Sequence, residues 1–202
     1  MKRLEYDFYN REDVVTIAKE LLGKILVSVI DGVKTSGRIV ETEAYAGATD
    51  KASHAYNGRR TNRTEIMFGD AGKAYVYLCY GIHHLFNIVT NVKDVPHAVL
   101  IRAIDPIDGI DEMLRRTKKA KADHTLTRGP GNVSKALGLY RHHTGADLLS
   151  DEIYIVKDDY QLSAKDIVSS TRIGVDYAAE DALLLYRFHV KNNPYVTKSK
   201  KT

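Results

Sequence analysis

Residues 38–47 read Arg-Ile-Val-Glu-Thr-Glu-Ala-Tyr-Ala-Gly, and the fold is organised around this stretch. Its alternation predicts a β-strand, in which side chains two residues apart lie on the same face. Glu41, Glu43 and Tyr45 then share one face. Three polar groups in a row indicate a site. On the pattern alone, however, a half-solvated strand whose glutamates meet water is the commoner explanation.

The neighbouring sequence supplies partners for such a site. Residues 24–30 and the Asp31-Gly32 turn make residues 38–47 part of the return strand of a hairpin. His54 and a basic loop at residues 57–63 follow, and a strand predicted at residues 73–80 carries three tyrosines. A carboxylate, a histidine, guanidinium groups and aromatic rings within a short span favour a chemical site.

The composition of the 202 residues permits one sizeable hydrophobic core. We expect a single domain at residues 1–197 and a basic, disordered tail at residues 198–202. A formal net charge of +4 and a pI near 9.0 permit a polyanionic partner without requiring one. A single cysteine, Cys79, excludes an internal disulfide. With no signal or membrane segment in the sequence, we expect a cytoplasmic protein.

Helices and strands follow one another without a strict βαβ order. We expect Asn10 to cap a helix that ends at Gly23, and further helices at residues 108–121, 133–137 and 178–182. Additional strands are predicted at residues 84–91, 95–104, 153–156, 167–175 and 184–190. Because the strands come in hairpins, we predict an α+β fold with a mixed, mostly antiparallel sheet and surrounding helices.

Two features of the predicted strands are unusual. Residues 81–83 form the tip of a hairpin, and Tyr80, Ile82 and His83 place bulky side chains where small polar ones are usual. Arg102 lies in an otherwise apolar run, which fits either a role in a site or an edge position from which its side chain reaches water.

These parts have a common use on DNA. Arginines contact phosphates, and a bulky residue in the minor groove unstacks a base step. An enzyme that acts on a base extrudes it into a pocket with aromatic walls. A carboxylate can deprotonate a water for attack at the sugar carbon, and tyrosine faces favour a positively charged base such as an alkylated purine.

Several motifs are specific in combination, although none is specific alone. They are Arg38-Ile39-Val40-Glu41-Thr42-Glu43-Ala44-Tyr45, His54, Met67-Phe68, Tyr75-Val76-Tyr77, Tyr80-Gly81, Asn87-Ile88, Leu100-Ile101-Arg102-Ala103, Gly129-Pro130 and Arg172-Ile173-Gly174-Val175. With them the chain resembles a bacterial member of the alkyladenine (3-methyladenine) DNA glycosylase family over nearly its whole length. The resemblance implies a protruding β-hairpin that enters the minor groove.

The resemblance also implies an activity. The chain would be a monofunctional glycosylase of base excision repair that acts on double-stranded DNA containing alkylated or deaminated purines, as a monomer, with no cofactor and no metal. Glu43 matches the general base, and Arg102 and the backbone of the pocket residue Ile173 help to hold the attacking water. Tyr80 matches the residue that replaces the extruded nucleotide in the stack.

The remaining matches are to positions that line the base pocket or face DNA. The base-pocket positions are Tyr45, His54, Tyr77 and Asn87, of which Asn87 obstructs the guanine amino group. The DNA-facing positions are Arg59, Thr61, Arg63, Met67, Ile82 and His83.

Other interpretations stay open at this point. A metal-dependent nuclease or phosphodiesterase could use Glu41, Glu43, Asp50 and His54 as ligands of a divalent ion. A non-catalytic minor-groove protein needs only the hairpin tip and the basic loop. The tyrosines also fit a cross-strand ladder, Asn87 fits a structural hydrogen-bonding role, and Glu41 fits an ion pair that supports the site.

Overall fold

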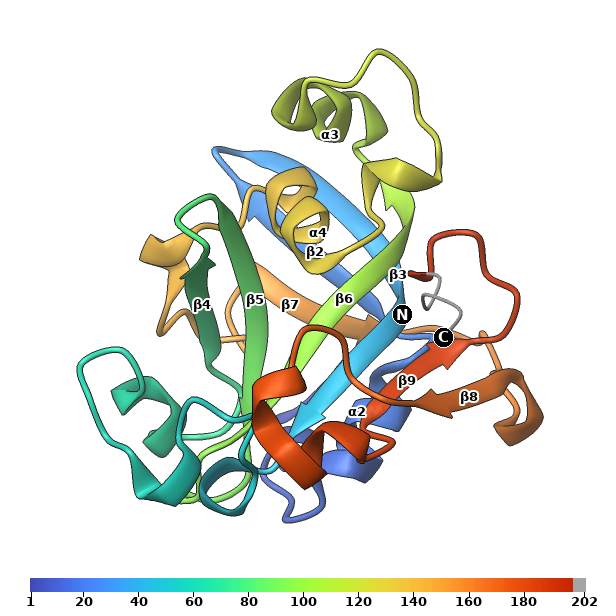
Figure 1. The fold of residues 1–202 in the computed structure, drawn as a ribbon. Helices are drawn as coiled ribbons and strands as arrows, with labels where there is room; N and C mark the ends of the chain where they lie inside the picture. The colour runs from blue at the N-terminus through green and yellow to red at the C-terminus, as the bar shows by residue number, and fades with distance from the viewer. Residues whose placement is uncertain (198–202) are drawn as a thin grey trace.

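The long strand β3 (Val33–Tyr45) is paired along both of its edges (Figure 1). In the computed structural model, which describes residues 1–197, β2 (Ile25–Ile30) pairs with the first half of β3 across the predicted turn. On that same edge β9 (Arg187–Val190) pairs with residues 41–43, and β6 (His97–Asp108) lies on the other edge. Residues 39–44 are also buried, so the expectation of a half-solvated strand whose glutamates meet water is wrong.

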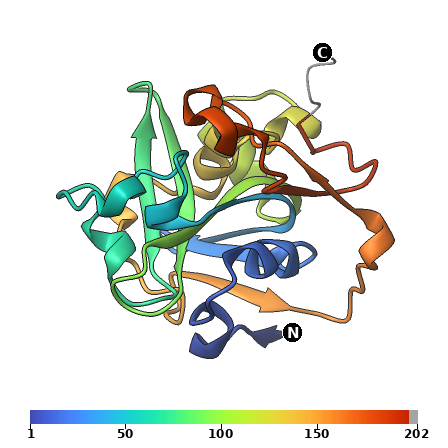
Figure 2. The same ribbon diagram turned by 60° about the horizontal axis from the view of Figure 1, so that its bottom comes forward.

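Every strand pair among residues 1–197 is antiparallel. Across the sheet the order is β1 (Lys2–Arg3), β7 (Ile153–Lys157), β2, β3, β6, β5 (His83–Thr90) and β4 (Ala74–Cys79). The remaining strand, β8 (Ile167–Ser170), pairs with β9. The predicted α+β fold with a mostly antiparallel sheet is confirmed. Figure 2 shows the β4–β5 hairpin projecting from the body of the molecule.

In the described part of the chain four α-helices surround the sheet, namely α1 (Tyr6–Tyr9), α2 (Val14–Leu21), α3 (Ile110–Thr117) and α4 (Pro130–Leu137). Residues of α2 and α4 belong to one hydrophobic core together with residues of the sheet. Side-chain hydroxyls attach both helices to the strands. Thr42 of β3 donates to the Ala18 carbonyl of α2 at 2.8 Å, and Ser28 of β2 donates to the Leu137 carbonyl of α4 at 2.7 Å.

The predicted helix boundaries needed correction at three places. Asn10 ends α1 instead of capping α2, and the cap of α2 is Asp13, whose carboxylate accepts the Thr16 N–H at 3.0 Å. α3 is shorter than predicted, because Asp108 still belongs to β6 and the left-handed backbone of Lys118 ends the helix. α4 begins at Pro130, since proline suits the first helical position.

The strand predicted at residues 167–175 ends at Ser170, and the strand predicted at residues 184–190 begins only at Arg187. Between them, residues 171–175 leave the sheet, and the predicted helix at residues 178–182 lies inside the longer 3₁₀ segment η7 (Asp176–Leu183). β6 in turn continues past Ile104 to Asp108. Residues 171–177 contribute to the site described below.

Several connections between the strands and α-helices contain short 3₁₀ helices. Residues 46–70 contain η1 (Gly47–Thr49), η2 (Tyr56–Gly58) and η3 (Glu65–Phe68). Elsewhere the chain has η4 (His124–Leu126), η5 (Arg141–His143) and η6 (Ala164–Asp166). Within residues 1–197 the helices are too short or too polar to span a bilayer. The predicted tail at residues 198–202 lies outside the described residues.

Two glycines with similar backbone angles allow a matched test of the turns. Gly109 has a φ of +72° and Gly32 a φ of +75°, but a Cβ on Gly109 would lie 2.4 Å from the Lys34 carbonyl oxygen, whereas one on Gly32 meets nothing. We expect Gly32→Ala to lower the free energy of unfolding by about 1 kcal/mol, and Gly109→Ala by about 2–4 kcal/mol. Urea denaturation measures both. Equal losses would contradict the close approach of Lys34.

Candidate active site

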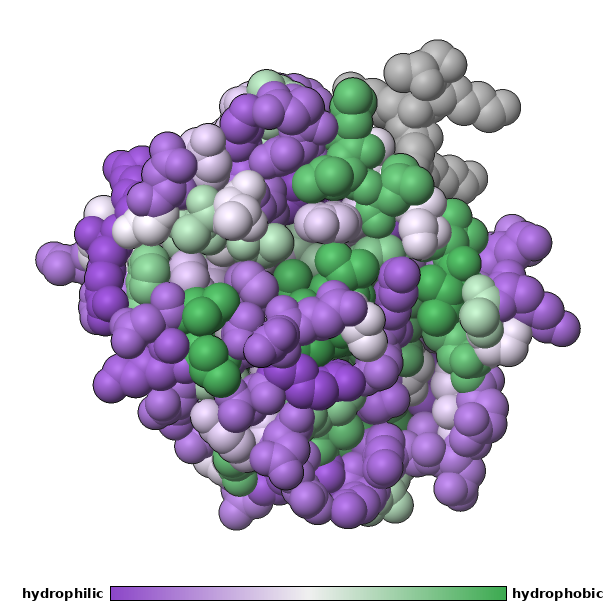
Figure 3. Space-filling view, turned by 90° about the horizontal axis from the view of Figure 1, so that it is seen from below, coloured by the Kyte–Doolittle hydropathy of each residue, from purple (hydrophilic) through white to green (hydrophobic). Residues whose placement is uncertain are grey.

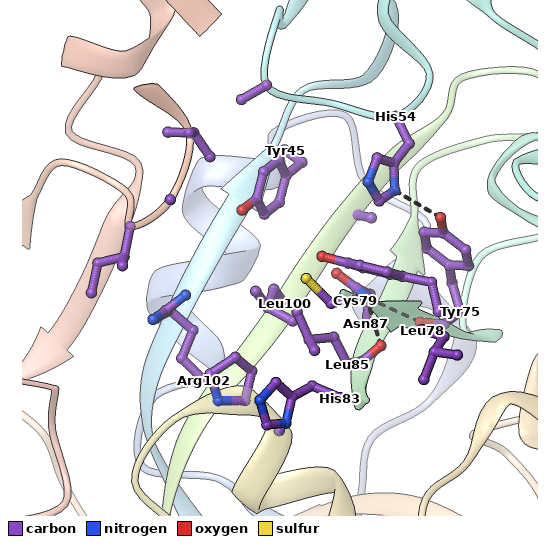
Figure 4. Close-up of a pocket in the computed structure, with 18 of the residues that line it drawn as sticks. Tyr45, His54, Tyr75, Leu78, Cys79, His83, Leu85, Asn87, Leu100 and Arg102 are labelled. Carbon is purple, nitrogen blue, oxygen red and sulfur yellow. Dashed lines mark hydrogen bonds between the residues drawn. The ribbon is translucent and has the colours of Figure 1, made fainter. Parts of the chain in front are cut away.

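A cavity of about 580 Å³ opens where β3, β4, β5 and β6 meet the loops (Figure 4). Tyr45 and Arg102 lie on one side of it and His54 lies on another, while His83 lies near Arg102. The loops contribute residues from the start of α4 and from the segment 173–177. Ten of the predicted site residues line this cavity: Tyr45, His54, Arg63, Met67, Tyr77, Tyr80, His83, Asn87, Arg102 and Ile173.

Glu43 lies directly beneath the wall of this cavity. Its side chain is fully buried, and it accepts hydrogen bonds from the Tyr45 hydroxyl and from the Ile173 N–H, both at 2.8 Å. Arg102 Nη1 forms an ion pair with Glu43 Oε2 at 3.2 Å. All three partners line the cavity. The carboxylate is therefore in contact with three residues of the cavity lining, and its orientation is fixed from three directions.

Arg102 reaches this position through an irregularity in strand pairing. Opposite β3, Glu41 pairs with Ala103 and Thr42 pairs with Ile101, so that Arg102 has no register partner on β3. Such a bulge redirects a side chain that regular alternation would place elsewhere. Arg102 is only 6% exposed and lies in a central strand, so the predicted alternative of an edge arginine reaching water is wrong.

Glu41, on the same face as Glu43, contacts two arginines. Its Oε1 accepts from Arg102 Nε at 3.1 Å and from Arg187 Nε at 2.6 Å, and its Oε2 accepts the Thr197 N–H at 3.0 Å. Burial by itself raises the pKa of Glu41, but the two guanidinium groups and the Thr197 N–H bring that pKa below its ordinary value. Glu41 is thus an ionised partner of Arg102 behind the cavity wall.

A separate buried ion pair, between Arg172 and Asp50, holds the segment that carries Ile173. Arg172 binds Asp50 through two bonds of 2.5 and 2.9 Å and donates to the Ala44 carbonyl at 3.0 Å. The Arg172 guanidinium also lies 4.9 Å from the centre of the Tyr45 ring. These contacts turn residues 171–175 away from the sheet and explain why β8 ends early. They also bring the Ile173 N–H to Glu43.

The aromatic wall is connected through His54. The His54 ring meets Tyr77 edge to face at 4.6 Å between centroids, its Nδ1 lies 2.8 Å from the Tyr75 hydroxyl, and its Nε2 lies 3.1 Å from Arg63. Guanidinium has no acceptor, so Nε2 must accept and Nδ1 must carry the proton that it donates to Tyr75. Burial first, then Arg63 and Arg59, lower the His54 pKa to about 4. His54 is therefore neutral at neutral pH.

Asn87 lies in the cavity with a fixed orientation. Its Nδ2 donates to the Tyr75 and Leu85 carbonyls, both at 3.1 Å, and the residue is 3% exposed. Asn87 therefore has the predicted structural hydrogen-bonding role and also lines the cavity. Because both amide hydrogens are committed to the backbone, the side chain cannot turn away from a ligand.

The hairpin tip carries Tyr80 in a strained turn. Tyr80 and Gly81 have φ values of +50° and +74°, and the Ile82 N–H donates to the Cys79 carbonyl at 3.2 Å. Hairpin turns of this kind favour Asn-Gly, so tyrosine costs about 1 kcal/mol here. Tyr80 is 88% exposed, which excludes it from an aromatic ladder with Tyr75 and Tyr77.

The predicted tip at residues 81–83 lies one residue too far along the chain. His83 already belongs to β5 and packs on the first turn of α4, where a Cβ on Gly131 would lie 2.9 Å from its ring. Ile82 remains at the tip and is 71% exposed. Arg59 and Thr61 are exposed on the loop outside the cavity, whereas Met67 is buried and contributes to the lining of the cavity.

The sequence places this site in a known family. Residues 7–194 match the model of the methylpurine-DNA glycosylase (MPG) family. The chain belongs to the methylpurine-DNA glycosylase family. It is 49% identical to a Clostridium perfringens (strain 13) protein named "Putative 3-methyladenine DNA glycosylase", over 97% of this chain and 99% of that protein. Proteins of the same name from Clostridium acetobutylicum and Bacillus mycoides are 46% and 45% identical, over 98% and 92% of this chain and 99% and 95% of theirs.

The metal-dependent alternative required ligands that this glycosylase does not bring together. Within residues 1–197 no three histidine, cysteine or acidic side chains form a group able to hold a metal ion. Glu41 and Glu43 bind arginines, Asp50 binds Arg172, and His54 binds Tyr75. As an enzyme of the DNA glycosylase class, the chain is also not a purely architectural DNA-binding protein.

Sequence reasoning missed part of the site in this family member. Arg187 lies inside a predicted strand, where the sequence does not distinguish it, and Arg172 is recognisable only as part of a motif. The sequence does not predict that Cys79, Leu100 and Tyr177 also line the cavity. The sequence feature that could indicate Arg187 is an isolated arginine in a mostly apolar strand, and this same feature does indicate Arg102.

The neutral state of His54 can be measured by NMR. Because the folded pKa of about 4 lies below the ordinary value near 6.5, the unfolded chain binds the proton first as pH falls. His54 should thus lower the free energy of unfolding progressively as the pH falls from about 6.5 to about 4, and it should have no effect above this range. We expect its ring carbon shifts in the folded protein to stay constant from pH 8 to about 5, and Arg63→Met to raise the midpoint. A wild-type midpoint above 6 would contradict the geometry.

Proposed function

We propose that this family member is a monofunctional DNA glycosylase that extrudes alkylated or deaminated purines from duplex DNA and hydrolyses their N-glycosidic bond. The observation that carries the proposal is the Glu43 carboxylate, held by Tyr45, Arg102 and Ile173 immediately behind a cavity large enough for a purine base. The substrates we propose are 3-methyladenine, 7-methylguanine, hypoxanthine and ethenoadenine. We propose that the enzyme acts as a monomer.

The cavity suits a purine that carries positive charge. Tyr45 and Tyr77 line the cavity with aromatic rings, which attract a cationic ring, and His54 is neutral, so it does not repel one. The Arg63 guanidinium, which also lines the cavity, lies 4.9 Å from the centre of the Tyr77 ring. Asn87 is held by two hydrogen bonds and cannot yield to an extra amino group. In this proposal the fixed amide obstructs the exocyclic amino group of unmodified guanine.

The reaction follows from the position of Glu43. In the proposed step, Glu43 accepts a proton from a water whose oxygen forms a bond to C1′ of the sugar. The C1′–N bond breaks and its electron pair leaves with the base. Arg102 and the backbone at Ile173 orient the water and the carboxylate.

The surface of the molecule has features that suit duplex DNA. Seen from below, it is mostly hydrophilic, with hydrophobic residues gathered in separate patches (Figure 3). Tyr80 and Ile82 are the exposed apolar residues at the hairpin tip. We propose that Tyr80 enters the minor groove and fills the gap left by the extruded nucleotide, while Arg59, Thr61 and Arg63 contact the backbone.

The lining of the cavity supports hydrolysis by water over covalent catalysis by an amine. Among the described residues no lysine lines the cavity, whereas a lyase that forms a Schiff base needs one there. The proposal therefore excludes a covalent intermediate with DNA. Trapping of an enzyme–DNA adduct by borohydride would contradict it.

Glu43→Gln tests the proposed base. We expect excision to fall by about 10²- to 10⁴-fold, because glutamine cannot accept the proton, while binding to lesion-containing duplex stays within a few-fold of wild type. The assay measures released base under single-turnover conditions, with chelator present, on four duplexes that each carry one of the proposed lesions. Glu152→Gln, an exposed site far along the sheet, is the matched control. Undiminished excision by Glu43→Gln would overturn the assignment.

Tyr80→Asn separates stability from function. Asparagine suits the left-handed backbone of the turn, so we expect the free energy of unfolding to rise by about 0.5–1 kcal/mol. Loss of the stacked ring should weaken base flipping by about 1–3 kcal/mol. The fluorescence of ethenoadenine, which increases on unstacking, reports flipping. Tyr80→Phe keeps the ring and serves as control, and normal flipping by Tyr80→Asn would refute the role of Tyr80.

A further inference from the structure

Arg187, at the start of β9, is a buried cation that does not line the cavity. Its side chain is 1% exposed. Its Nε donates to Glu41 at 2.6 Å, and its Nη2 donates to the Thr197 carbonyl. Arg187 does not line the cavity, so it does not contact a base or a phosphate there, and its connection to the site is Glu41, which also binds Arg102.

Glu41 is the link between the two arginines. Its Oε1 accepts from both Nε atoms, that of Arg102 at 3.1 Å and that of Arg187 at 2.6 Å. The contact fixes the Nε edge of Arg102, while the Nη1 end of the same guanidinium faces Glu43 at 3.2 Å. The four side chains form a continuous buried row in the order Arg187, Glu41, Arg102, Glu43.

The charges in this row balance only when Arg187 is included. Two carboxylates and two guanidinium groups sum to zero, and each of the four side chains is at least nine-tenths buried. Without Arg187, Glu41 and Glu43 would share the single charge of Arg102. Two buried carboxylates that share one cation cannot both remain ionised easily, and the pKa of at least one of them rises.

Other groups face these carboxylates, but none replaces Arg187. Glu43 interacts electrostatically with tyrosines and with Arg172, whose charge is already matched by Asp50. Opposite Glu41 on β9 lies His189, whose pKa is lowered by burial and then by Arg187, so it is neutral near pH 7. The groups around the row are Tyr45 of β3, Tyr77 of β4, His189 of β9, and Arg172 and Tyr177 from the segment after β8.

We propose that Arg187 is a positioning residue that neutralises Glu41, so that the charge of Arg102 is left for Glu43, the base of the proposed function. In this arrangement Glu41 orients Arg102 and Arg187 cancels the charge of Glu41. Removal of Arg187 makes Glu41 a competitor for Arg102. Removal of Glu41 as well as Arg187 restores the balance.

The test is the pH dependence of single-turnover excision from pH 4 to 9, on whichever of the four lesion duplexes the wild type cleaves fastest. At acidic pH the excision rate falls as pH decreases, and this part of the pH–rate profile is its acid limb. We expect Arg187→Met to move the acid limb to higher pH by roughly one unit or more, while the rate at high pH stays near wild type. Arg187→Lys, which keeps the charge, should leave the limb in place. Glu41→Gln should not raise the limb, and Glu41→Gln/Arg187→Met should return it toward wild type.

A merely structural role predicts a different result. If Arg187 only stabilises the fold, Arg187→Met lowers the rate equally at all pH values and the double variant does not recover, which overturns the inference. Circular dichroism checks folding, and Arg187→Gln replaces Arg187→Met if the latter does not fold. If Glu43→Gln is inactive and the acid limbs of all Arg187 variants coincide, only this inference fails. If Glu43→Gln remains active, the proposed function fails first.

Discussion

Two neighbouring carboxylates buried in a central strand are the constraint on which the rest of this structure depends. An unpaired carboxylate in such a place costs several kcal/mol, so the fold must bring a cation to each of Glu41 and Glu43. The strands on the two edges of β3 do so, because β6 carries Arg102 and β9 carries Arg187. The strands that pair with β3 thus also supply the cations that compensate its carboxylates. The bulge at Arg102 is the local irregularity that directs the Arg102 side chain toward Glu43.

The cavity combines this rigid interior with a projecting edge. Glu43 is held from three directions, and its neighbours Tyr45 and Ile173 are themselves held by the Arg172–Asp50 pair. The hairpin tip is the opposite case, an exposed tyrosine kept in an unfavourable backbone region. Strain of that kind persists where it has a use. The family to which the chain belongs acts on DNA. The fixed carboxylate and the exposed tyrosine both suit the proposed reaction on an extruded base.

Much of the fold could be predicted because local patterns carry it. The Asp31-Gly32 turn and the alternation after it predicted β3, and the antiparallel sheet followed from the hairpins. Predictions failed where distant residues decide, as at Ser170, where Arg172 turns toward Asp50 and ends the strand. In the site, motifs identified Arg102 and His54, but Arg187 acts on a partner 146 residues away, and a separation of that length leaves no local periodicity.

The length of that connection also bears on how the protein is made. During synthesis Glu41 emerges from the ribosome long before Arg187 and Thr197, which complete its set of partners. Until Arg187 and Thr197 have been synthesised, β3 cannot pair with β9, and Glu41 lacks part of its charge compensation. The buried centre of the sheet is therefore completed only after residues 187–197 have left the ribosome.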